Sequence, residues 1–429
     1  MTQQTDPPSI TAYIAQRLRG LLSQLETPPA TLVVGFSGGV DSTVLLHAAV
    51  LTSPLPVHGV YIHHGLSTNA DEWQAHCQRY CQQHQIPFHA IHVDVVDQAR
   101  KSLEEQARNA RYAALTAYCQ QHQGALLLGQ HQDDQLETLL LTLKRGSGPL
   151  GLAAMTEISY RGHIAVLRPL LSLSRRQIEQ TALAHDLNWI FDESNLDPRF
   201  DRNFLRNDII PLLKKRWPHI ASTAARSCDL LQEQNAMLQD VIEERYTLAA
   251  GPNHTLLVKP LLALKRRWQR AVCRHWLAKD SLAMPSQAQL DEILRCLHAR
   301  EDAQPLVQVG DYAVRRFAGA LYVCQPLAPA TEAILVPHQK HHLPWWYTDF
   351  IIQQSGAWRA VPFTSLSKVY SVKNRVSKTP RKWLKEWHVP PWERDNVPLL
   401  LKDDEPVAVL LKETVVELQD GIADKIVIY

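Results

Sequence analysis

The segment Val33–Ser42 carries residue types suited to holding a phosphate group and a metal ion. Its apolar start predicts a buried strand, and the apolar stretch 43–51 after the Ser-Gly-Gly turn predicts a helix. Backbone N–H groups in such a turn, together with the helix N-terminus, can bind a phosphate. A carboxylate beside a phosphate, here Asp41, indicates a Mg²⁺ ion between them. The expected nucleotide contacts are Ser37, Gly38, Gly39, Val40, Asp41 and Ser42, and Asp41 is also the expected metal ligand.

This segment differs from the two commonest nucleotide-binding motifs. No Gly-Lys-Ser/Thr follows the glycines, and the third glycine of GxGxxG is missing. An ordinary Ser-Gly turn at the end of a strand is the alternative interpretation. It explains the order of strand, loop, acid and helix less well.

The block His131–Thr138 contains a second group of candidate residues. Asp134 and Glu137 are three positions apart, so on a helix they share one face. Two carboxylates on one face repel each other unless a cation, either Mg²⁺ or a substrate amine, lies between them. Alternatively, these acids only complement the dipole of a helix N-terminus.

Three further polar groups follow other predicted elements. His63 and His64 lie at the end of a predicted strand, where adjacent side chains point to opposite faces, so nucleotide contact is more plausible than a shared metal. A pair of loop histidines with satisfied hydrogen bonds is the alternative. Glu104, Arg108 and Arg111 share one face of a predicted helix, which makes them candidates for a site. The alternative is an ordinary ion pair exposed to solvent. The polar stretch 192–206, with Asp192–Asn195, Arg202 and Asn203, suits a phosphate or RNA backbone, or is an exposed loop.

Alternating strand and helix patterns extend to about residue 215. Strands are predicted at 32–36, 57–63, 88–95 and 125–129, with helices between them such as 102–121. This order predicts an α/β domain with a parallel, doubly wound sheet, in which ligands bind at the carboxyl ends of the strands.

After about residue 215 the alternation of strands and helices ends. Helices are predicted at 220–250, 261–279 and 286–299, a hairpin at 306–323 and a linker at 328–344, before a strand-rich end. We expect a catalytic domain at 1–218, a mostly helical domain at 219–330 and a small α+β domain at 331–429.

Composition limits the class of protein. The chain has 429 residues and a net charge of only +2, so the whole-chain charge does not indicate a nucleic-acid partner. Its seven cysteines include no C-x-x-C pair, which favours free thiols in a reducing cytosol. No apolar run approaches the roughly 18 residues of a membrane span, so we expect a cytoplasmic protein without membrane contact. The oligomeric state stays open.

Two basic stretches indicate RNA binding. The segments 259–279 and 368–385 each contain seven Lys or Arg and no acid, with aromatic residues among them. Such patterns suit a phosphate backbone and stacked bases, although a charge run is often just a solvated face. The expected RNA contacts are Arg266, Arg267, Arg270, Arg381, Lys382, Trp383, Lys385 and Arg394.

Together these blocks resemble the tRNA(Ile)-lysidine synthase family. SGGVDS is similar to the loop of PP-loop ATP pyrophosphatases, and HHGLS at 63–67, HQDDQLET at 131–138 and PPWERD at 390–395 narrow the resemblance. It implies the PP-loop ATPase, or adenine-nucleotide alpha-hydrolase, fold for the first domain and covers nearly the whole chain. Residues 220–365 match weakly by motif.

The resemblance implies a reaction and roles. ATP, with Mg²⁺, adenylates the C2 oxygen of the wobble cytidine of a CAU-anticodon isoleucine tRNA, and the side-chain amine of free L-lysine displaces AMP. Asp134 and Glu137 would bind this amine, and Arg108 or Arg111 its carboxylate. One carboxylate or His131 would deprotonate the amine. The remaining implied contacts are His63 and His64 to the nucleotide, and Arg202 and Asn203 to substrate.

Two alternatives remain. Another PP-loop tRNA-modifying enzyme is one; a thiolase would usually need the missing C-x-x-C pair. A catalytically silent RNA-binding protein is the other, and the intact Ser37, Asp41, Ser42, Asp134 and Glu137 argue against it.

Overall fold

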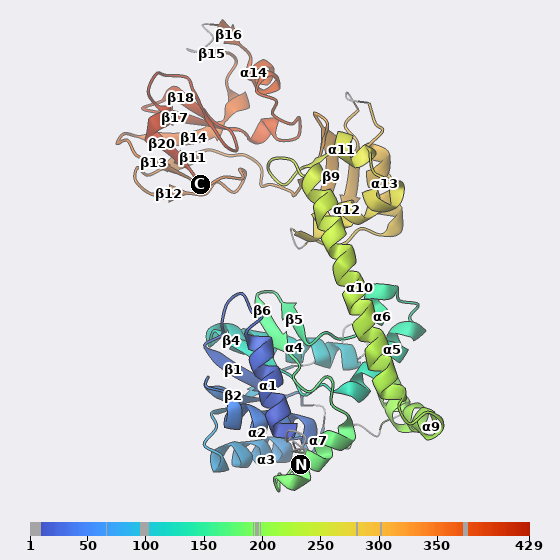
Figure 1. The fold of residues 1–429 in the computed structure, drawn as a ribbon. Coiled ribbons are helices and arrows are strands. Elements are labelled where there is room, and N and C mark those ends of the chain that lie inside the picture. Colours follow the sequence, from blue (N-terminus) through green and yellow to red (C-terminus); the bar gives the residue numbers. More distant parts are fainter. Residues whose placement is uncertain are drawn as a thin grey trace, which may run out of the picture. The chain divides into compact units, whose positions relative to one another are not determined.

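The computed structural model of the protein describes residues 10–65, 67–94, 103–191, 193, 197, 199–279, 282–300, 303–371 and 376–429. Two compact units, Met1–Leu238 and Gln239–Tyr429, divide the chain. Figure 1 labels many of the elements of each unit.

A six-stranded sheet with the order β3-β2-β1-β4-β6-β5 forms the centre of the first unit. All neighbouring strands run parallel except β5, which is antiparallel to β6. The strand order reverses between β1 and β4, so the carboxyl ends of these two strands are where this fold binds ligands. The strands are β1 (Thr31–Gly35), β2 (Val57–His63), β3 (Phe88–His92), β4 (Gly124–Leu127), β5 (Ile158–Arg161) and β6 (Ile164–Leu167).

Helices cover both faces of this sheet (Figure 1). Leu32 and Val34 of β1 point into the larger core, whereas Val33 between them points into the smaller core on the opposite face. The helices of the larger core are α1 (Ile10–Leu22), α2 (Val40–Thr52), α3 (Ala70–Gln83) and α7 (Arg175–Ala184), and the smaller core contains α4 (Leu103–Gln121). The predicted doubly wound α/β class is confirmed.

A second group of helices completes the first unit. Leu136 and Ile210 pack with Ala221 and Ala224 in a separate buried cluster, which ties three of these helices together. The group comprises α5 (Gln132–Lys144), α6 (Pro149–Leu152), α8 (Asp201–Phe204), the π-helix η2 (Leu205–Ile209), α9 (Ile210–Arg216) and the start of α10 (Ile220–Ala249).

The second unit begins with helices packed on an antiparallel sheet of order β7-β10-β9-β8. Trp276 and Leu290 lie in its core. The elements after α10 are β7 (Leu256–Leu257), α11 (Val258–Leu262), α12 (Arg266–Lys279), α13 (Gln287–Cys296), β8 (Leu306–Val309), β9 (Tyr312–Phe317) and β10 (Ala320–Cys324).

Small sheets make up the rest of the second unit. A five-stranded sheet has the order β11-β14-β17-β18-β19, and β12-β13-β20 and β15-β16 form the others. The elements are β11 (Ala333–Leu335), β12 (Lys340–His341), β13 (Phe350–Ile352), β14 (Trp358–Pro362), η3 (Phe363–Ser365), β15 (Val369–Ser371), β16 (Val376–Lys378), α14 (Pro380–Glu386), η4 (Arg394–Asn396), β17 (Pro398–Lys402), β18 (Glu405–Leu410), β19 (Val415–Glu417), η5 (Ala423–Lys425) and β20 (Ile426–Ile428).

Several predicted elements differ from those observed. The predicted helix 261–279 is the two helices α11 and α12, which both bury apolar residues at helical spacing. The predicted hairpin 306–323 has three strands, with turns at Gly310 and Gly319, whose φ angles are 54° and 75°. The predicted linker 328–344 contains β11 and β12, and the β5–β6 hairpin was not predicted. The predicted domain boundaries stay a prediction.

Candidate functional site

The Ser37–Ser42 loop connects β1 to α2 at the switch point of the sheet. Ser42 Oγ lies 3.2 Å from Ser37 Oγ and donates to the Gly39 carbonyl at 3.0 Å. Gly38 has φ 78°, and a Cβ there would lie 2.8 Å from Ile190 Cδ1, so only glycine fits. The first N–H groups of α2 have no partner within the helix, which makes this loop suitable for an anion.

Asp41 lies in the first turn of α2 and is mostly buried. Its Oδ2 accepts a hydrogen bond from Arg175 Nη1 at 2.6 Å, and its Oδ1 lies 3.6 Å from His131 Nε2. Burial raises the pKa of Asp41, while His131 and Arg175 oppose the shift. Among the described residues Oδ1 is buried and accepts no hydrogen bond.

This unsatisfied carboxylate oxygen fits a metal ion. Mg²⁺ commonly takes one or two protein carboxylates and completes its shell with phosphates and water. Within the described ranges no cluster of three or more His, Cys, Asp or Glu could hold a metal. A metal at Asp41 would therefore take most of its ligands from the nucleotide and solvent.

His131 caps the helix that carries the two acids. Its Nδ1 accepts a hydrogen bond from the Asp133 N–H at 3.2 Å, and Asp134 Oδ2 accepts one from the His131 N–H at 3.0 Å. These two bonds form a capping box at the start of α5. The helix-start interpretation of these acids is therefore correct for Asp134, which leaves its Oδ1 for another partner.

Asp134 and Glu137 share a cation, Arg206. Arg206 Nη2 lies 2.9 Å from Asp134 Oδ1, and Arg206 Nε lies 2.6 Å from Glu137 Oε1. The Glu137 side chain is only 1% exposed. Burial raises the pKa of Glu137 despite Arg206. Burial also opposes ionisation of Asp134, but His131 and Arg206 outweigh it and lower its pKa.

Arg206 reaches these acids from a π-helical turn. It lies in η2, between α8 and α9, and Pro211 follows near the start of α9. Pro211 has no N–H to donate to the preceding turn, so an α-helical hydrogen-bond pattern cannot run through it. In the sequence, Arg206 stands out only as the last residue of the polar stretch 192–206. The feature of the sequence that indicates an irregular helical turn at Arg206 is Pro211, which follows a helix start rich in Arg and Asn.

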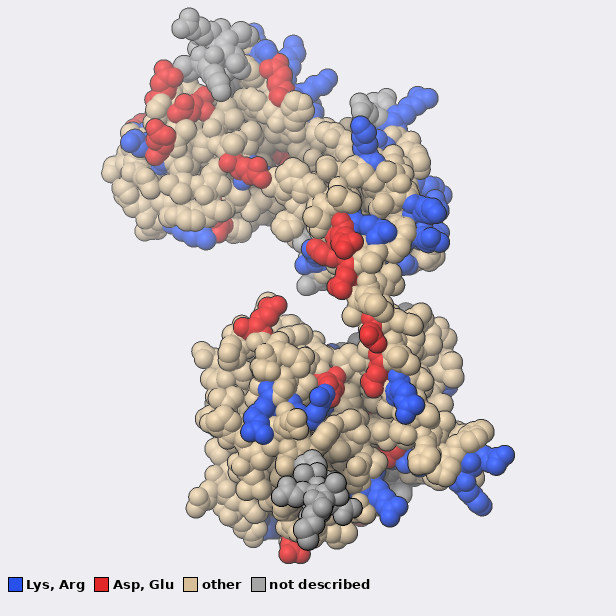
Figure 2. All heavy atoms as spheres, viewed as in Figure 1, with Lys and Arg blue, Asp and Glu red and all other residues tan. Residues whose placement is uncertain are grey.

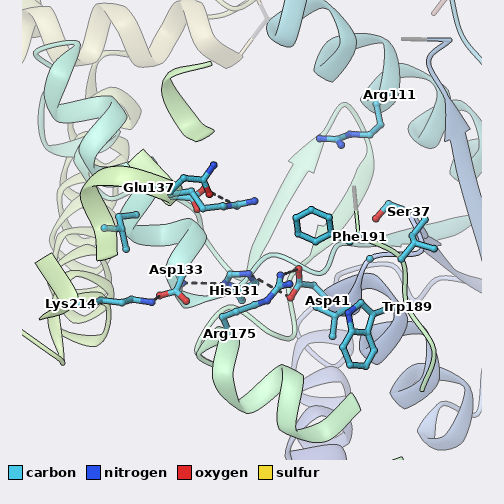
Figure 3. Close-up of a pocket in the computed structure, with 16 residues that line it drawn as sticks. Ser37, Asp41, Arg111, His131, Asp133, Glu137, Arg175, Trp189, Phe191 and Lys214 are labelled. Atoms are coloured by element: carbon cyan, nitrogen blue, oxygen red, sulfur yellow. Dashed lines mark hydrogen bonds and ion pairs between the residues drawn. The ribbon is translucent and has the colours of Figure 1, made fainter. Parts of the chain in front are cut away.

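Two pockets meet at the loop. The large pocket, about 490 Å³, contains Asp41, His131, Glu137 and Arg206 (Figure 3). The small pocket, about 310 Å³, shares Ser37, Gly39, Asp41 and Arg111 with it and is lined further by apolar residues and by His64. Its apolar lining comprises Val60, Ile62, Leu115 and Leu128, among others. The geometry thus joins an anion loop, an acid pair and an apolar cavity.

The predicted substrate-binding residues Arg108, Arg111, Arg202 and Asn203 have different surroundings. Arg111 lines both pockets, whereas the Arg108 guanidinium lies over the Tyr112 ring, 5.5 Å from its centroid. Arg202 lies 3.3 Å from Glu137 Oε2 and belongs with the acid pair. Asn203 is buried and donates to the Asp197 carbonyl at 3.0 Å, so it holds the preceding loop.

The two adjacent histidines have different surroundings, as strand geometry predicts. His64 lines the small pocket, where burial and then Arg111 lower its pKa to about 4. His63 lies 3.1 Å from Asp71 and stacks on His92. Four predicted positions, Leu66, Asp192, Ser194 and Asn195, lie outside the described residues, as does the Glu104 side chain.

Two arginines of the first basic stretch, 259–279, are already paired with an acid of a neighbouring helix. Arg266 and Arg270 lie 3.1 and 2.8 Å from Asp291 of α13, whose pKa their hydrogen bonds help lower to about 2. Arg267 is exposed. Figure 2 shows basic side chains gathered over the α12–α13 region. Trp276 of the same stretch is fully buried and offers no stacking surface.

In the second basic stretch the prediction for Trp383 is wrong. This ring is 0% exposed and stacks on Trp387, with centroids 5.6 Å apart, because α14 turns it into the core. Arg381, Lys382 and Lys385 are exposed on the same helix, and Arg394 donates to the Val389 carbonyl. Lys373 and Arg375 lie outside the described residues.

Several side chains of the large pocket, among them Arg175, Lys214, Trp189 and Phe191, were not predicted from the sequence. Arg175 binds Asp41, and Lys214 lies 2.7 Å from Asp133. Trp189 and Phe191 also line the pocket. The partners lie far apart in sequence, so no local spacing could have joined them.

None of the helices in the described ranges is long and apolar enough to cross a membrane.

Comparisons with known proteins agree along the chain. Family models for a PP-loop domain, a TilS substrate binding domain and a TilS substrate C-terminal domain match residues 10–213, 256–322 and 367–414. The chain is 39% identical to a tRNA(Ile)-lysidine synthase of Edwardsiella ictaluri, over 94% of this chain and 93% of that protein. It is 38% identical to that of Escherichia coli O157:H7, over 91% of this chain and 95% of that protein.

Proposed function

Because the chain belongs to the tRNA(Ile)-lysidine synthase family, we propose that it joins free L-lysine to the wobble cytidine of a CAU-anticodon isoleucine tRNA, using ATP. The observation that carries this proposal is the buried acid pair beside the anion loop. Asp134 and Glu137 already hold one cation, Arg206, at hydrogen-bond distance. The same carboxylates suit the ammonium group of lysine.

The first step is adenylation of the cytidine. Its C2 oxygen attacks the α-phosphorus of ATP, and the bond to pyrophosphate breaks. The Ser37–Ser42 loop would bind the departing phosphates through backbone N–H groups, and Arg175 lies near enough to Asp41 to add a positive charge. Asp41 would hold Mg²⁺, which when bound neutralises phosphate charge. The small pocket, with its apolar lining, suits adenosine.

The second step is transfer of lysine. The amine nitrogen attacks C2 of the adenylated cytidine, the C2–O bond breaks, and the oxygen leaves with AMP. The ammonium must first lose a proton. Glu137 would accept this proton, because burial raises its pKa, once the lysine ammonium has replaced Arg206 at its oxygens.

Arg111 would bind the lysine carboxylate, since it lines the same pocket as Glu137, whereas Arg108 is stacked on Tyr112. RNA contacts outside the first unit would come from exposed cations. Arg267, Arg381, Lys382 and Lys385 meet that condition, and Trp383 does not.

The test separates the two steps by measuring pyrophosphate release and labelled-lysine transfer on the same tRNA. Glu137→Gln and Asp134→Asn should keep pyrophosphate release and raise the lysine KM or abolish transfer. Asp41→Ala should lose both. Asp208→Asn, an exposed acid on the same helical segment as Arg206, is the matched control and should retain both. An unchanged lysine KM in both acid-pair variants would contradict the proposed amine site.

A further inference from the structure

Two aromatic rings line the large pocket without a role in the steps above. Trp189 is 36% exposed and Phe191 is 65% exposed. Figure 3 shows the Phe191 ring between Arg111 and Asp41, with Trp189 next to Asp41. We call these two side chains the aromatic pair.

The residue between them fixes the pair to the anion loop. The Ile190 N–H donates to the Gly38 carbonyl at 2.9 Å. The Ile190 side chain packs so closely on Gly38 that a Cβ there would lie 2.8 Å from Cδ1. Ile190 is therefore turned toward the loop, and both of its neighbours line the pocket. The exposed rings have a fixed attachment next to the reacting groups.

The surroundings favour an RNA base as the partner of these rings. Four cations, Arg111, Arg175, Arg206 and Lys214, line the same pocket as three carboxylates, Asp41, Asp133 and Glu137, so the lining keeps a small excess of positive charge for a phosphate backbone. Unpaired bases of single-stranded RNA stack on aromatic side chains. The cavity proposed above for adenosine is the small pocket, which neither ring lines.

We propose that Trp189 and Phe191 form a stacking platform for the RNA base that this site modifies. This inference rests on the proposed function, because it takes the modified base to be the wobble cytidine. The platform would hold the unpaired base within the pocket that Glu137 and the anion loop line.

The test measures binding of an RNA stem-loop with a CAU anticodon, without ATP or lysine. A second stem-loop has an abasic ribose at the wobble position. Wild type should bind the complete RNA more tightly, by roughly ten- to a hundredfold, the range for one lost base–aromatic stack. Phe191→Ala and Trp189→Ala should reduce that preference, and Phe191→Tyr should keep it.

The matched control is Phe204→Ala. Phe204 is 45% exposed and lines neither pocket, so its loss should leave the preference unchanged. Thermal unfolding of each variant verifies that the first unit remains folded, and Phe191→Tyr keeps the ring if alanine does not fold.

Three outcomes would overturn the platform: no preference in wild type, the same preference in the alanine variants, or weakened ATP binding with an unchanged RNA preference. The last would assign the rings to adenine. Lysine transfer, assayed separately, distinguishes the two proposals. A base preference that depends on the pair, without any lysine transfer, would remove the proposed function and keep a base-binding platform. Normal lysine transfer by Phe191→Ala and Trp189→Ala, with an unchanged base preference, would remove the platform and keep the proposed function.

Discussion

Replacing Arg206 with alanine should destabilise the first unit, because two carboxylates would lose their shared cation. Arg206 Nε is 2.6 Å from Glu137 Oε1, and its Nη2 is 2.9 Å from Asp134 Oδ1. Removing one partner of a buried pair costs about 3–5 kcal/mol. Arg206 is 35% exposed and Arg202 stays 3.3 Å from Glu137, so we expect about 2 kcal/mol. For a unit of this size that lowers Tm by about 4–8 °C.

The deficit should depend on pH in a defined direction. Without Arg206, the pKa of buried Glu137 rises further above its value in the unfolded chain. A carboxyl whose folded pKa is raised binds more protons when folded, so stability falls as pH rises through the unfolded pKa. The Tm difference between wild type and Arg206→Ala should therefore be larger at about pH 8 than at about pH 5. Thermal unfolding followed by circular dichroism measures it.

Two variants control this prediction. Adding Glu137→Gln to Arg206→Ala should recover much of the stability, because a neutral amide does not need a cation. Arg199→Ala removes an exposed ion pair with Asp197 and should leave Tm nearly unchanged. The reasoning is refuted if the double variant is as unstable as Arg206→Ala, or if Arg206→Ala is as stable as Arg199→Ala.

Three other predictions concern the loop, the base and the C-terminal core. Gly38→Ala should lower Tm and ATP affinity, because φ is 78° and the added Cβ would lie under 3 Å from its neighbours. The control Gly39→Ala, at a φ of −72°, should keep wild-type Tm. Equal Tm values for the two variants would contradict this prediction. The lysine KM should rise as pH falls from about 8 to about 5, because burial raises the pKa of Glu137 and its protonated form no longer attracts the ammonium; a flat KM would exclude Glu137. Trp383→Ala should cost about 3–5 kcal/mol and lose near-ultraviolet circular dichroism along with RNA binding; weaker binding with an intact core would restore a surface role.

Local signals in the sequence were sufficient for the main architecture. The Ser37–Ser42 loop follows an apolar strand and precedes an apolar helix, and all three are observed in that order. The topology of alternating strands and helices also brings His131 within 3.6 Å of Asp41, although 90 residues separate them. Parallel strands force such meetings because their carboxyl ends share one edge.

The arginine partners of the site carboxylates come from distant segments of the chain and could not be predicted from local residue spacing. Arg175 and Arg206 reach Asp41 and the acid pair from elements whose packing no residue spacing encodes. The π-helical turn at η2 has no periodic signature of its own. Consequently, the sequence indicated the acid pair but not Arg206, which contacts both carboxylates in the structure.

Burial was the other property that sequence patterns misjudged. Trp383 lies among basic residues, which favoured a surface role, but α14 has one buried face and Trp383 is on it. Asp291 partly neutralises the basic stretch on α12 from a neighbouring helix, so counting charges along one segment overestimated its field. Both errors arise because tertiary packing sets exposure.

The most direct test of the proposed function is incorporation of labelled lysine into an isoleucine tRNA transcript with a CAU anticodon. The reaction contains ATP and Mg²⁺, and AMP and pyrophosphate are measured with it. We expect equal amounts of lysine incorporated, AMP and pyrophosphate for wild type, and none of the three for Asp41→Ala. Conversion of ATP to AMP with this tRNA but without lysine incorporation would contradict it, because another nucleophile would then have to accept the adenylated base.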